Sequence, residues 1–397
     1  MLSFMIAKGG IMQNFRFHAP TEIVFGKDQI KNLPDLLAPY GKKILLAYGG
    51  GSIKRNGIYD TILTLLNDFE IVEFPNIEPN PHLNSVRRGV NLCKEHQVDM
   101  VLAVGGGSVI DCAKVVAAGA YYEDDPWDIV VDSQKITKAL PLFSVLTLAG
   151  TGSEMNRGAV ITNTDINVKK GTGAPSMVPI ASIVDPTYLY TLPAYQTAAG
   201  SVDIFSHILE NYFKEEPNAF VQDRIAEAIL KTVIKFAPIA IEEPENYVAR
   251  ANLAWASSLA LNGITGSGKP GAWAVHPIEH ELSAYYDLTH GVGLAIITPV
   301  WMRYTLNDTN LDRYVTYGIN VFNIDPTLPK TDIASKAIDA TEAFFKSLNI
   351  PMRLSDVNID DTYFDTMAEN AMKLGRLELA AIPLTKQDVI EILRQCI

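Results

Sequence analysis

The feature that most constrains the fold of this chain is a change of pattern near residue 190. Before it, short apolar runs alternate with amphipathic stretches, and the runs end in turns that contain Gly or Pro. After Pro193, nearly every segment carries apolar residues at helical spacing. The pattern predicts an α/β domain over residues 1–190 and an all-helical domain over residues 191–397.

The expected elements follow from these runs and spacings. In the first domain we expect strands at residues 43–48, 70–74, 99–104, 143–148, 158–162 and 181–184, and helices at 59–69, 85–96 and 109–120. In the second domain we expect helices at residues 196–213, 220–237, 247–261, 278–286, 333–348 and 388–396.

Composition and charge exclude several classes of protein. Of the 397 residues, 48% are apolar and 20% are charged, a mixture that can bury a large core. The net charge of −12 repels phosphate backbones and anionic lipid surfaces, so neither nucleic acid nor a membrane is an expected partner. Residues 1–13 are too short and broken for a signal-peptide core. Three widely spaced cysteines, Cys93, Cys112 and Cys396, indicate no disulfide framework and fit a reducing cytoplasm.

A glycine-rich turn is the first candidate for a binding site. Gly105-Gly106-Gly107-Ser108 follows an expected strand and opens an expected helix. Glycines let the backbone approach a ligand closely, and free N–H groups at a helix start favour an anion such as a pyrophosphate. The alternative is a tight turn that uses glycine only for its backbone angles. The spacing matches neither the dinucleotide fingerprint GxGxxG nor a Walker loop.

A second cluster of small polar residues follows another apolar run. Residues 147–154 read TLAGTGSE and include Thr147 and Ser153. Their hydroxyls and free amides can hydrogen-bond ribose or phosphate oxygens, although such clusters are often plain turns.

An Asp-His pair in the helical half is the first candidate for a metal site. Asp203 and His207 are four residues apart in an apolar stretch, so on a helix they share one largely buried face. A buried carboxylate beside an imidazole needs compensation. The two side chains therefore either hydrogen-bond each other or share a metal ion.

Three more histidines, His276, His280 and His290, follow in the helical half. Pro277 suits the first position of a helix, which places His276 at the start of that helix and His280 one turn later. One Asp and three neutral imidazoles would suit Fe(II) or Zn(II), and spacing alone favours His276 with His280 as a chelating pair. The alternative is a set of core histidines that are satisfied by hydrogen bonds.

Six strings resemble the iron-containing, group III alcohol dehydrogenases, and most of all their butanol dehydrogenase and broad-range aldehyde reductase branch. These strings are YGGGSIKRNG (48–57), GGGSVIDCAK (105–114), TLAGTGSEMN (147–156), DPTYLYTLP (185–193), DIFSHILE (203–210) and HPIEHELSAYYDLTHGVGLAI (276–296). The resemblance runs from about Asn14 to the C-terminus. Residues 1–11 lie outside it as an extension, and Met12 is the start that it implies.

The resemblance implies a nucleotide-binding α/β domain followed by an all-helical domain, a dehydroquinate synthase-like architecture with cofactor and metal in the cleft between the domains. It implies one divalent ion, Fe(II) first and Zn(II) or another ion as alternatives, with ligands matching Asp203, His207, His276 and His290. His280 would then neighbour the nicotinamide and the substrate. Implied cofactor contacts are Gly49, Gly50, Gly51, Ser52, Gly105, Gly106, Gly107, Ser108, Asp111, Thr147, Ser153, Lys169 and Tyr188.

The predicted function is that of a metal-dependent alcohol dehydrogenase or aldehyde reductase. Hydride would pass between a nicotinamide cofactor and a small primary alcohol or aldehyde, with the metal as Lewis acid on the oxygen. His280 is predicted to relay a proton, because an imidazole titrates near the pH at which protons must be transferred at an alcohol oxygen. A homodimer or larger homo-oligomer is expected, since dimers are the commonest soluble assembly.

The turn after residues 43–48 predicts NADP(H) in preference to NAD(H). An acidic residue there would repel a 2′-phosphate. Here Gly49-Gly50-Gly51-Ser52 leaves room and offers amides and a hydroxyl, and Lys54 and Arg55 add positive charge. If those two charges are solvated and the glycines only turn the chain, both cofactors are accepted.

Two other functions stay open at this point. A dehydroquinate synthase-type lyase would also use NAD and a metal, but it should line its cleft with Lys and Arg, and residues 263–294 contain only Lys269. A nucleotide-binding protein without turnover would not need Asp203 and three histidines in the helical half.

Overall fold

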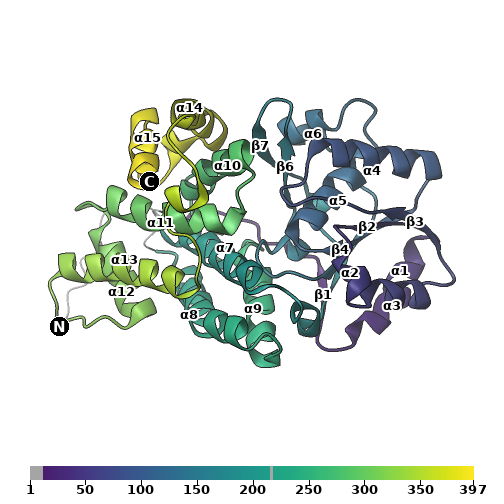
Figure 1. The fold of residues 1–397 in the computed structure, drawn as a ribbon, viewed down its shortest axis with the longest axis horizontal. Helices are drawn as coiled ribbons and strands as arrows, with labels where there is room; N and C mark the ends of the chain where they lie inside the picture. Colours follow the sequence, from purple (N-terminus) through teal and green to yellow (C-terminus); the bar gives the residue numbers. More distant parts are fainter. Residues whose placement is uncertain (1–11, 215–217) are drawn as a thin grey trace.

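A computed structural model describes residues 12–214 and 218–397; the expected extension, residues 1–11, lies outside the described residues. Within that part, six strands form a parallel sheet in the order β1-β8-β5-β4-β2-β3, seen on the right of Figure 1. The strands are β1 (Glu22–Phe25), β2 (Lys43–Tyr48), β3 (Glu70–Phe74), β4 (Met100–Gly105), β5 (Leu142–Leu146) and β8 (Ala181–Val184). In the described ranges, no helix combines the length and apolar character needed to cross a bilayer.

Helices cover both faces of this sheet, which is why its central strands are continuously apolar. Side chains alternate along β2, so Ile44 and Leu46 pack under α1–α3 while Leu45 and Ala47 pack under α4–α6. The helices are α1 (Leu33–Leu37), α2 (Ser52–Arg55), α3 (Ile58–Leu65), α4 (Leu83–His96), α5 (Gly107–Gly119) and α6 (Trp127–Val131).

A separate antiparallel hairpin, β6 (Gly158–Asn163) with β7 (Val168–Gly173), projects from the α/β half toward the helical half (Figure 1). Strand β6 was expected from the sequence. Strand β7 was not, because VKKGTG holds a single apolar residue and shows no alternation. The hairpin packs against α5, α6 and α10, so it connects the sheet half to the helical half.

The helical half is built around α7, which packs against α8, α9 and α11. The predicted fold class is confirmed: a parallel sheet with helices is followed by a half made of helices alone. The helices are α7 (Ala194–Tyr212), α8 (Phe220–Glu242), α9 (Tyr247–Ala260), α10 (Val275–Tyr286), α11 (His290–Thr305), α12 (Leu311–Phe322), α13 (Lys330–Ser347), α14 (Phe364–Gly375) and α15 (Lys386–Gln395).

Two local expectations in the helical half need correction. Helix α10 begins at Val275, so Pro277 is its third residue and not its first, and His276 lies inside the first turn. Proline is tolerated there because the first-turn N–H groups have no helical partner. Helix α11 was not expected, because it is apolar on all sides and therefore lacks a helical period.

Candidate metal and cofactor site

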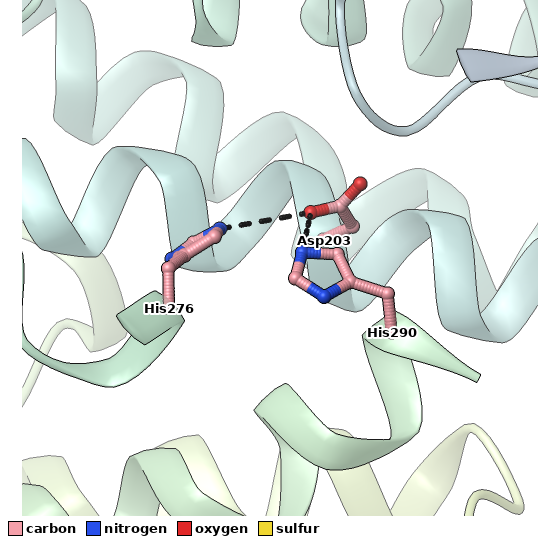
Figure 2. A group of neighbouring side chains, drawn as sticks. All are labelled: Asp203, His276 and His290. Atoms are coloured by element: carbon pink, nitrogen blue, oxygen red, sulfur yellow. Dashed lines mark ion pairs between the residues drawn. The ribbon is translucent and has the colours of Figure 1, made fainter. Parts of the chain in front are cut away.

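Three helices bring the sequence-predicted metal ligands together. Helix α7 carries Asp203 and His207 on one face, α10 presents His276 from its first turn, and α11 presents His290 as its first residue. Figure 2 shows the Nε2 atoms of His276 and His290 aimed at one oxygen of Asp203. From Asp203 Oδ1 the distances are 3.5 Å to His207 Nε2, 3.6 Å to His290 Nε2 and 3.9 Å to His276 Nε2.

These distances exceed those of hydrogen bonds, and they leave buried polar atoms without partners. Asp203 Oδ1 and His276 Nε2, which face each other, are buried and accept or donate no hydrogen bond. Orphaned buried polar atoms are costly and call for an explanation. Bonds of about 2.0–2.2 Å to one ion would hold its ligand atoms about 3–4 Å apart. The donor set therefore fits a divalent metal ion.

Without a metal, the charges in this cluster favour the ligating forms of Asp203 and His207 but the protonated form of His276. Burial acts to raise the pKa of Asp203, but the surrounding imidazoles, His207 first, outweigh burial and hold that pKa well below its usual range. Burial lowers the pKa of His207 to about 4, so the ring is neutral at pH 7. Burial also acts to lower the pKa of His276, but the carboxylates of Asp203 and Glu210 raise it to about 9.

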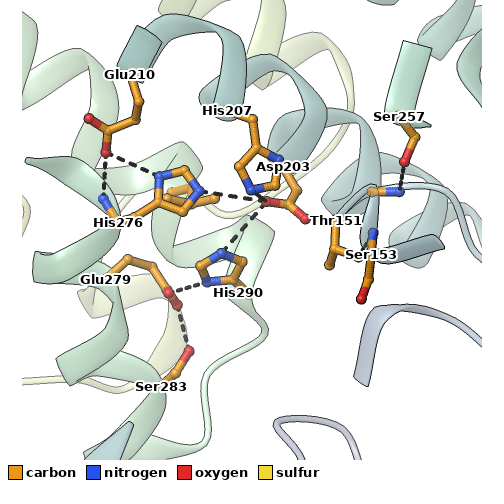
Figure 3. Close-up of polar contacts among 12 residues, drawn as sticks. Thr151, Ser153, Asp203, His207, Glu210, Ser257, His276, Glu279, Ser283 and His290 are labelled. Carbon is orange, nitrogen blue, oxygen red and sulfur yellow. Dashed lines mark hydrogen bonds and ion pairs between the residues drawn. The ribbon is translucent and has the colours of Figure 1, made fainter. Parts of the chain in front are cut away.

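Two buried glutamates orient the imidazoles from the outer side, as Figure 3 shows. Glu210 Oε1 lies 3.1 Å from the ring atom Nδ1 of His276. The same oxygen accepts a hydrogen bond from the backbone N–H of His276 at 2.8 Å. Glu279 Oε2 contacts His290 Nδ1. Such carboxylates fix the tautomer and the orientation of a ligating ring. Sequence reasoning missed both, although each is a charged residue in an apolar helical stretch.

His280 lines the cavity beside these rings. Its ring centroid is 6.4 Å from that of His276 and 5.6 Å from that of His290. One group of three residues with mutually close ligand atoms joins Asp203, His276 and His290, and it includes neither His207 nor His280. A second such group joins Glu279, His280 and His290, but His290 Nε2 faces Asp203. Burial, followed by the charge of Lys169, keeps the pKa of His280 well below its ordinary value.

The sequence-predicted cofactor turns lie at the carboxyl ends of parallel strands. Residues 49–52 follow β2, residues 105–108 follow β4, and Thr147 follows β5 and donates its N–H to the Gly105 carbonyl at 3.0 Å. The chain leaves β2 toward β3 on one side and leaves β4 toward β5 on the other, so a topological switch point lies between β2 and β4. Ligands of open α/β sheets bind at such a point.

A buried network of hydrogen bonds holds the loop after β5 against α5. The Asp111 carboxylate accepts the Ser153 hydroxyl at 2.5 Å and the Val160 N–H at 2.9 Å. Lys114 Nζ donates to Ser153 Oγ at 2.8 Å and to Asn156 Oδ1 at 3.0 Å. Asp111 is thus engaged by protein groups, and Lys114, which sequence reasoning did not single out, is the cation that compensates it. Burial lowers the pKa of Lys114 to about 8.

A cavity of about 510 Å³ joins the two halves. Its wall includes predicted cofactor contacts from the α/β half and predicted metal ligands from the helical half. These are Ser108, Asp111, Ser153, Lys169, His207, His276 and His290, together with His280. The other predicted site residues do not line it; these are residues 49–52, residues 105–107, Thr147, Tyr188 and Asp203. Tyr188 packs beside the core under α1–α3, where burial raises the pKa of its phenol.

The charges around the turn after β2 differ from the sequence expectation. Lys54 Nζ lies 3.4 Å from Glu73 Oε2, and the hydroxyls of Tyr48 and Tyr59 donate to the same carboxylate at 2.5 Å. The charge of Lys54 is therefore partly balanced. Glu73 was missed because it belongs to the next strand, β3, which pairs with β2.

Two family models match nearly the whole described chain. The model "Iron-containing alcohol dehydrogenase" matches residues 20–186, and the C-terminal model of the Fe-containing alcohol dehydrogenase family matches residues 197–397.

Individual relatives give the same result. The chain is 50% identical to NADH-dependent butanol dehydrogenase A of Clostridium acetobutylicum over 97% of its length and 100% of that protein. It is 41% identical to the NADPH-dependent aldehyde reductase YqhD of Escherichia coli, over 93% of this chain and 95% of that one. The crystal structure of NADH-dependent butanol dehydrogenase A from Thermotoga maritima superposes with a TM-score of 0.92 at 42% identity, covering 97% of this chain and 99% of that one. The chain therefore belongs to the iron-containing alcohol dehydrogenase family of NAD(P)-dependent oxidoreductases.

Proposed function

We propose that this enzyme holds one divalent ion at Asp203, His207, His276 and His290, and that it moves hydride between a nicotinamide cofactor and a small primary alcohol or aldehyde. One observation carries the proposal: a single cavity is lined by imidazoles of the metal cluster and by Ser108, Ser153 and Lys169. Both reactants can therefore meet beside the metal site.

The chain's own residues divide the work of the reaction. Fe(II), or Zn(II) in its place, supplies Lewis acidity to the alcohol or carbonyl oxygen when it is bound. Helices α7, α10 and α11 hold the four ligands, and Glu210 and Glu279 fix two of the rings. His280 lines the cavity as a neutral imidazole, which can accept a proton from an alcohol oxygen or pass one back. Lys169 offers a positive charge to the cofactor.

The proposal includes a preference for NADP(H) over NAD(H). A Cβ on Gly50 or Gly51 would meet nothing within 4 Å, so the turn after β2 leaves room for a 2′-phosphate. Arg55 is exposed beside it, and Ser52 offers a hydroxyl. The Glu73 carboxylate opposes the preference because it balances Lys54. Relatives carry both names: the Clostridium enzyme is named NADH-dependent and YqhD NADPH-dependent.

The ratio of kcat/KM for NADPH to that for NADH, measured with one aldehyde, tests this preference. We expect a ratio above one, and a larger ratio for Glu73→Gln, because that change removes a negative charge beside the turn. Glu70→Gln is the matched control, because Glu70 lies at the other end of β3 and pairs with Lys43 at 3.1 Å. An NADH value equal to or above the NADPH value contradicts the preference.

The reaction itself is tested at 340 nm with butanal and reduced cofactor. Anaerobic enzyme loaded with Fe(II) should oxidise the cofactor, and removal of the metal by a chelator should stop the reaction. A protein that binds nucleotide without turnover would bind the cofactor and leave the absorbance unchanged. Family membership does not favour the lyase, and Lys269 does not serve it, since Lys269 is buried and pairs with Asp223 at 2.5 Å.

Three further expectations are part of this proposal. The α/β unit spans residues 1–190 and the helical unit residues 191–397. The enzyme assembles as a homodimer or larger homo-oligomer and works in the cytoplasm. Light scattering with chromatography checks the assembly, and limited proteolysis near residue 191 checks the division into two units.

A further inference from the structure

A buried line of contacts runs from the cofactor side of the cavity to the metal cluster. Lys169, on the hairpin strand β7, donates from Nζ to Asn80 Oδ1 at 3.0 Å. The same Nζ lies 3.9 Å from Glu279 Oε2 on helix α10. The side chain of Lys169 is 5% exposed and that of Glu279 is 0% exposed.

Glu279 is held firmly at the centre of this line. Its Oε2 contacts His290 Nδ1, and its Oε1 accepts the Ser283 hydroxyl at 2.6 Å. Helix α11 passes close by: a Cβ on Gly293 would lie 2.7 Å from Glu279 Cγ. Glycine at position 293 thus leaves the space that the glutamate side chain occupies.

The two contacts of Glu279 act on different reactants. A carboxylate on the outer nitrogen of His290 makes that imidazole a better ligand. The same carboxylate balances the ammonium of Lys169, and this lowers the positive charge that the cavity offers to an anionic cofactor. Neither effect could be read from the sequence, because Glu279 and Lys169 are 110 positions apart in the chain.

We propose that Glu279 is a positioning residue that strengthens the metal site through His290 and weakens cofactor binding through Lys169. The inference rests on the proposed function for the identity of the metal ligands. It adds that one carboxylate raises the affinity for the metal and lowers the affinity for the cofactor. A residue that only supported packing would change both affinities in the same direction when replaced.

Glu279→Gln tests the proposal, since it keeps the shape of the side chain and removes the charge. We expect the affinity for Fe(II) or Zn(II), measured by competition with a chromophoric chelator, to fall about 10- to 100-fold. In metal-free protein we expect NADPH, followed by its nicotinamide fluorescence, to bind about 3- to 10-fold more tightly. Equal weakening of both, or no change in either, overturns the proposal.

Two further variants sharpen the result. Glu281→Gln, two residues along the same helix, is the control for replacing a buried glutamate that contacts neither His290 nor Lys169 through a hydrogen bond or ion pair: it accepts from Asn370 at 3.1 Å, and its replacement should leave both affinities unchanged. Ser283→Ala keeps the charge of Glu279 and removes one of its hydrogen bonds. It should weaken metal binding about 2- to 5-fold and leave the NADPH affinity as it is, which keeps the proposal testable if Glu279→Gln does not fold.

The metal titration of the unchanged enzyme separates this inference from the proposed function. If the wild-type chain retains no metal, the proposed ligand set fails. If the wild-type chain binds metal and Glu279→Gln binds it equally well, the role of Glu279 fails and the ligand set stands.

Discussion

His276 and His280 occupy neighbouring turns of α10 and meet different surroundings. His276 is buried between the carboxylates of Asp203 and Glu210. His280 is partly buried in the cavity wall. The same residue type thus serves two purposes one turn apart, and substitutions should separate them.

We expect His276→Ala to lose the metal and the activity while the α/β half stays folded. The change removes a nitrogen that faces Asp203. Metal analysis after anaerobic purification measures the loss of the metal. NADPH binding checks that the α/β half stays folded. Stoichiometric metal with a near-normal rate would exclude His276 as a ligand.

We expect His280→Ala to keep its metal and to lose activity by roughly 100-fold or more, the usual scale for an acid–base group. Steady-state kcat with butanal, measured beside the metal content, provides the test. Loss of the metal in this variant would instead support the chelating pair of His276 and His280 that spacing alone suggested.

At this scale the sequence predicts part of the site. Asp203 and His207 follow from four-residue spacing on a helix, but the choice of His290 over His280 came only from the family resemblance. The outer glutamates could not be predicted, because a glutamate in an amphipathic pattern reads as solvent-facing. Glu210 contacts His276 and Glu279 contacts Lys169, and both partners lie far away in the chain.

Among the elements, α7 is approached by backbone on two sides. A Cβ on Gly200 would lie 2.3 Å from the Ala149 carbonyl oxygen, in the loop after β5. A Cβ on Gly291, in the first turn of α11, would lie 2.0 Å from the Ala199 carbonyl oxygen. Glycine at these two positions therefore sets how closely α7 approaches the loop after β5 and α11.

We expect Gly200→Ala to destabilise the enzyme by about 1–3 kcal/mol, the usual cost of overpacking. The sign of the change in unfolding free energy is informative, because alanine normally stabilises a helix interior by about 1 kcal/mol relative to glycine. Urea unfolding with a fixed slope measures the change. Gly171→Ala is the control, since a Cβ there would meet nothing within 4 Å; a Gly200→Ala protein as stable as wild type would contradict the close approach.

Two of the elements that were not predicted, α11 and β7, share one physical cause, whereas α12 and α14 were missed although both are amphipathic. Helix α11 is buried on every side and strand β7 is polar along its length, so neither has a contrast between two faces. Periodicity reports a half-buried element, and it is silent for elements that are wholly buried or wholly polar. Strands β2 and β4 were predictable because apolar runs bounded by glycine are distinctive.

Across the whole molecule, buried titratable groups couple stability to pH. Glu281 lies on α10 facing Asn370 of α14 and is 1% exposed. Burial raises its pKa to about 8, the charge of Glu279 adds to the rise, and the Asn370 hydrogen bond opposes it. A raised carboxyl pKa means that the folded protein binds a proton that the unfolded chain gives up near pH 4.5.

The stabilisation from this proton is complete below pH 4.5 and is lost as the pH rises toward 8. We expect Glu281→Gln to match wild type near pH 4.5 and to be more stable at pH 8, by at most about 4 kcal/mol since one pKa unit corresponds to about 1.4 kcal/mol. Tm measured for both proteins across this range is the check. A constant Tm difference would show that Glu281 titrates normally.

The position of the four proposed metal ligands in the chain also has a consequence for biosynthesis. Asp203 and His207 leave the ribosome long before His290, and at about 5–20 residues per second the delay is roughly 4 to 17 seconds. During that interval α7 carries a carboxylate and an imidazole without its two remaining partners. A nascent chain stalled before residue 276 should therefore fold its nucleotide-binding half and yet fail to retain iron, so that metal loading follows translation.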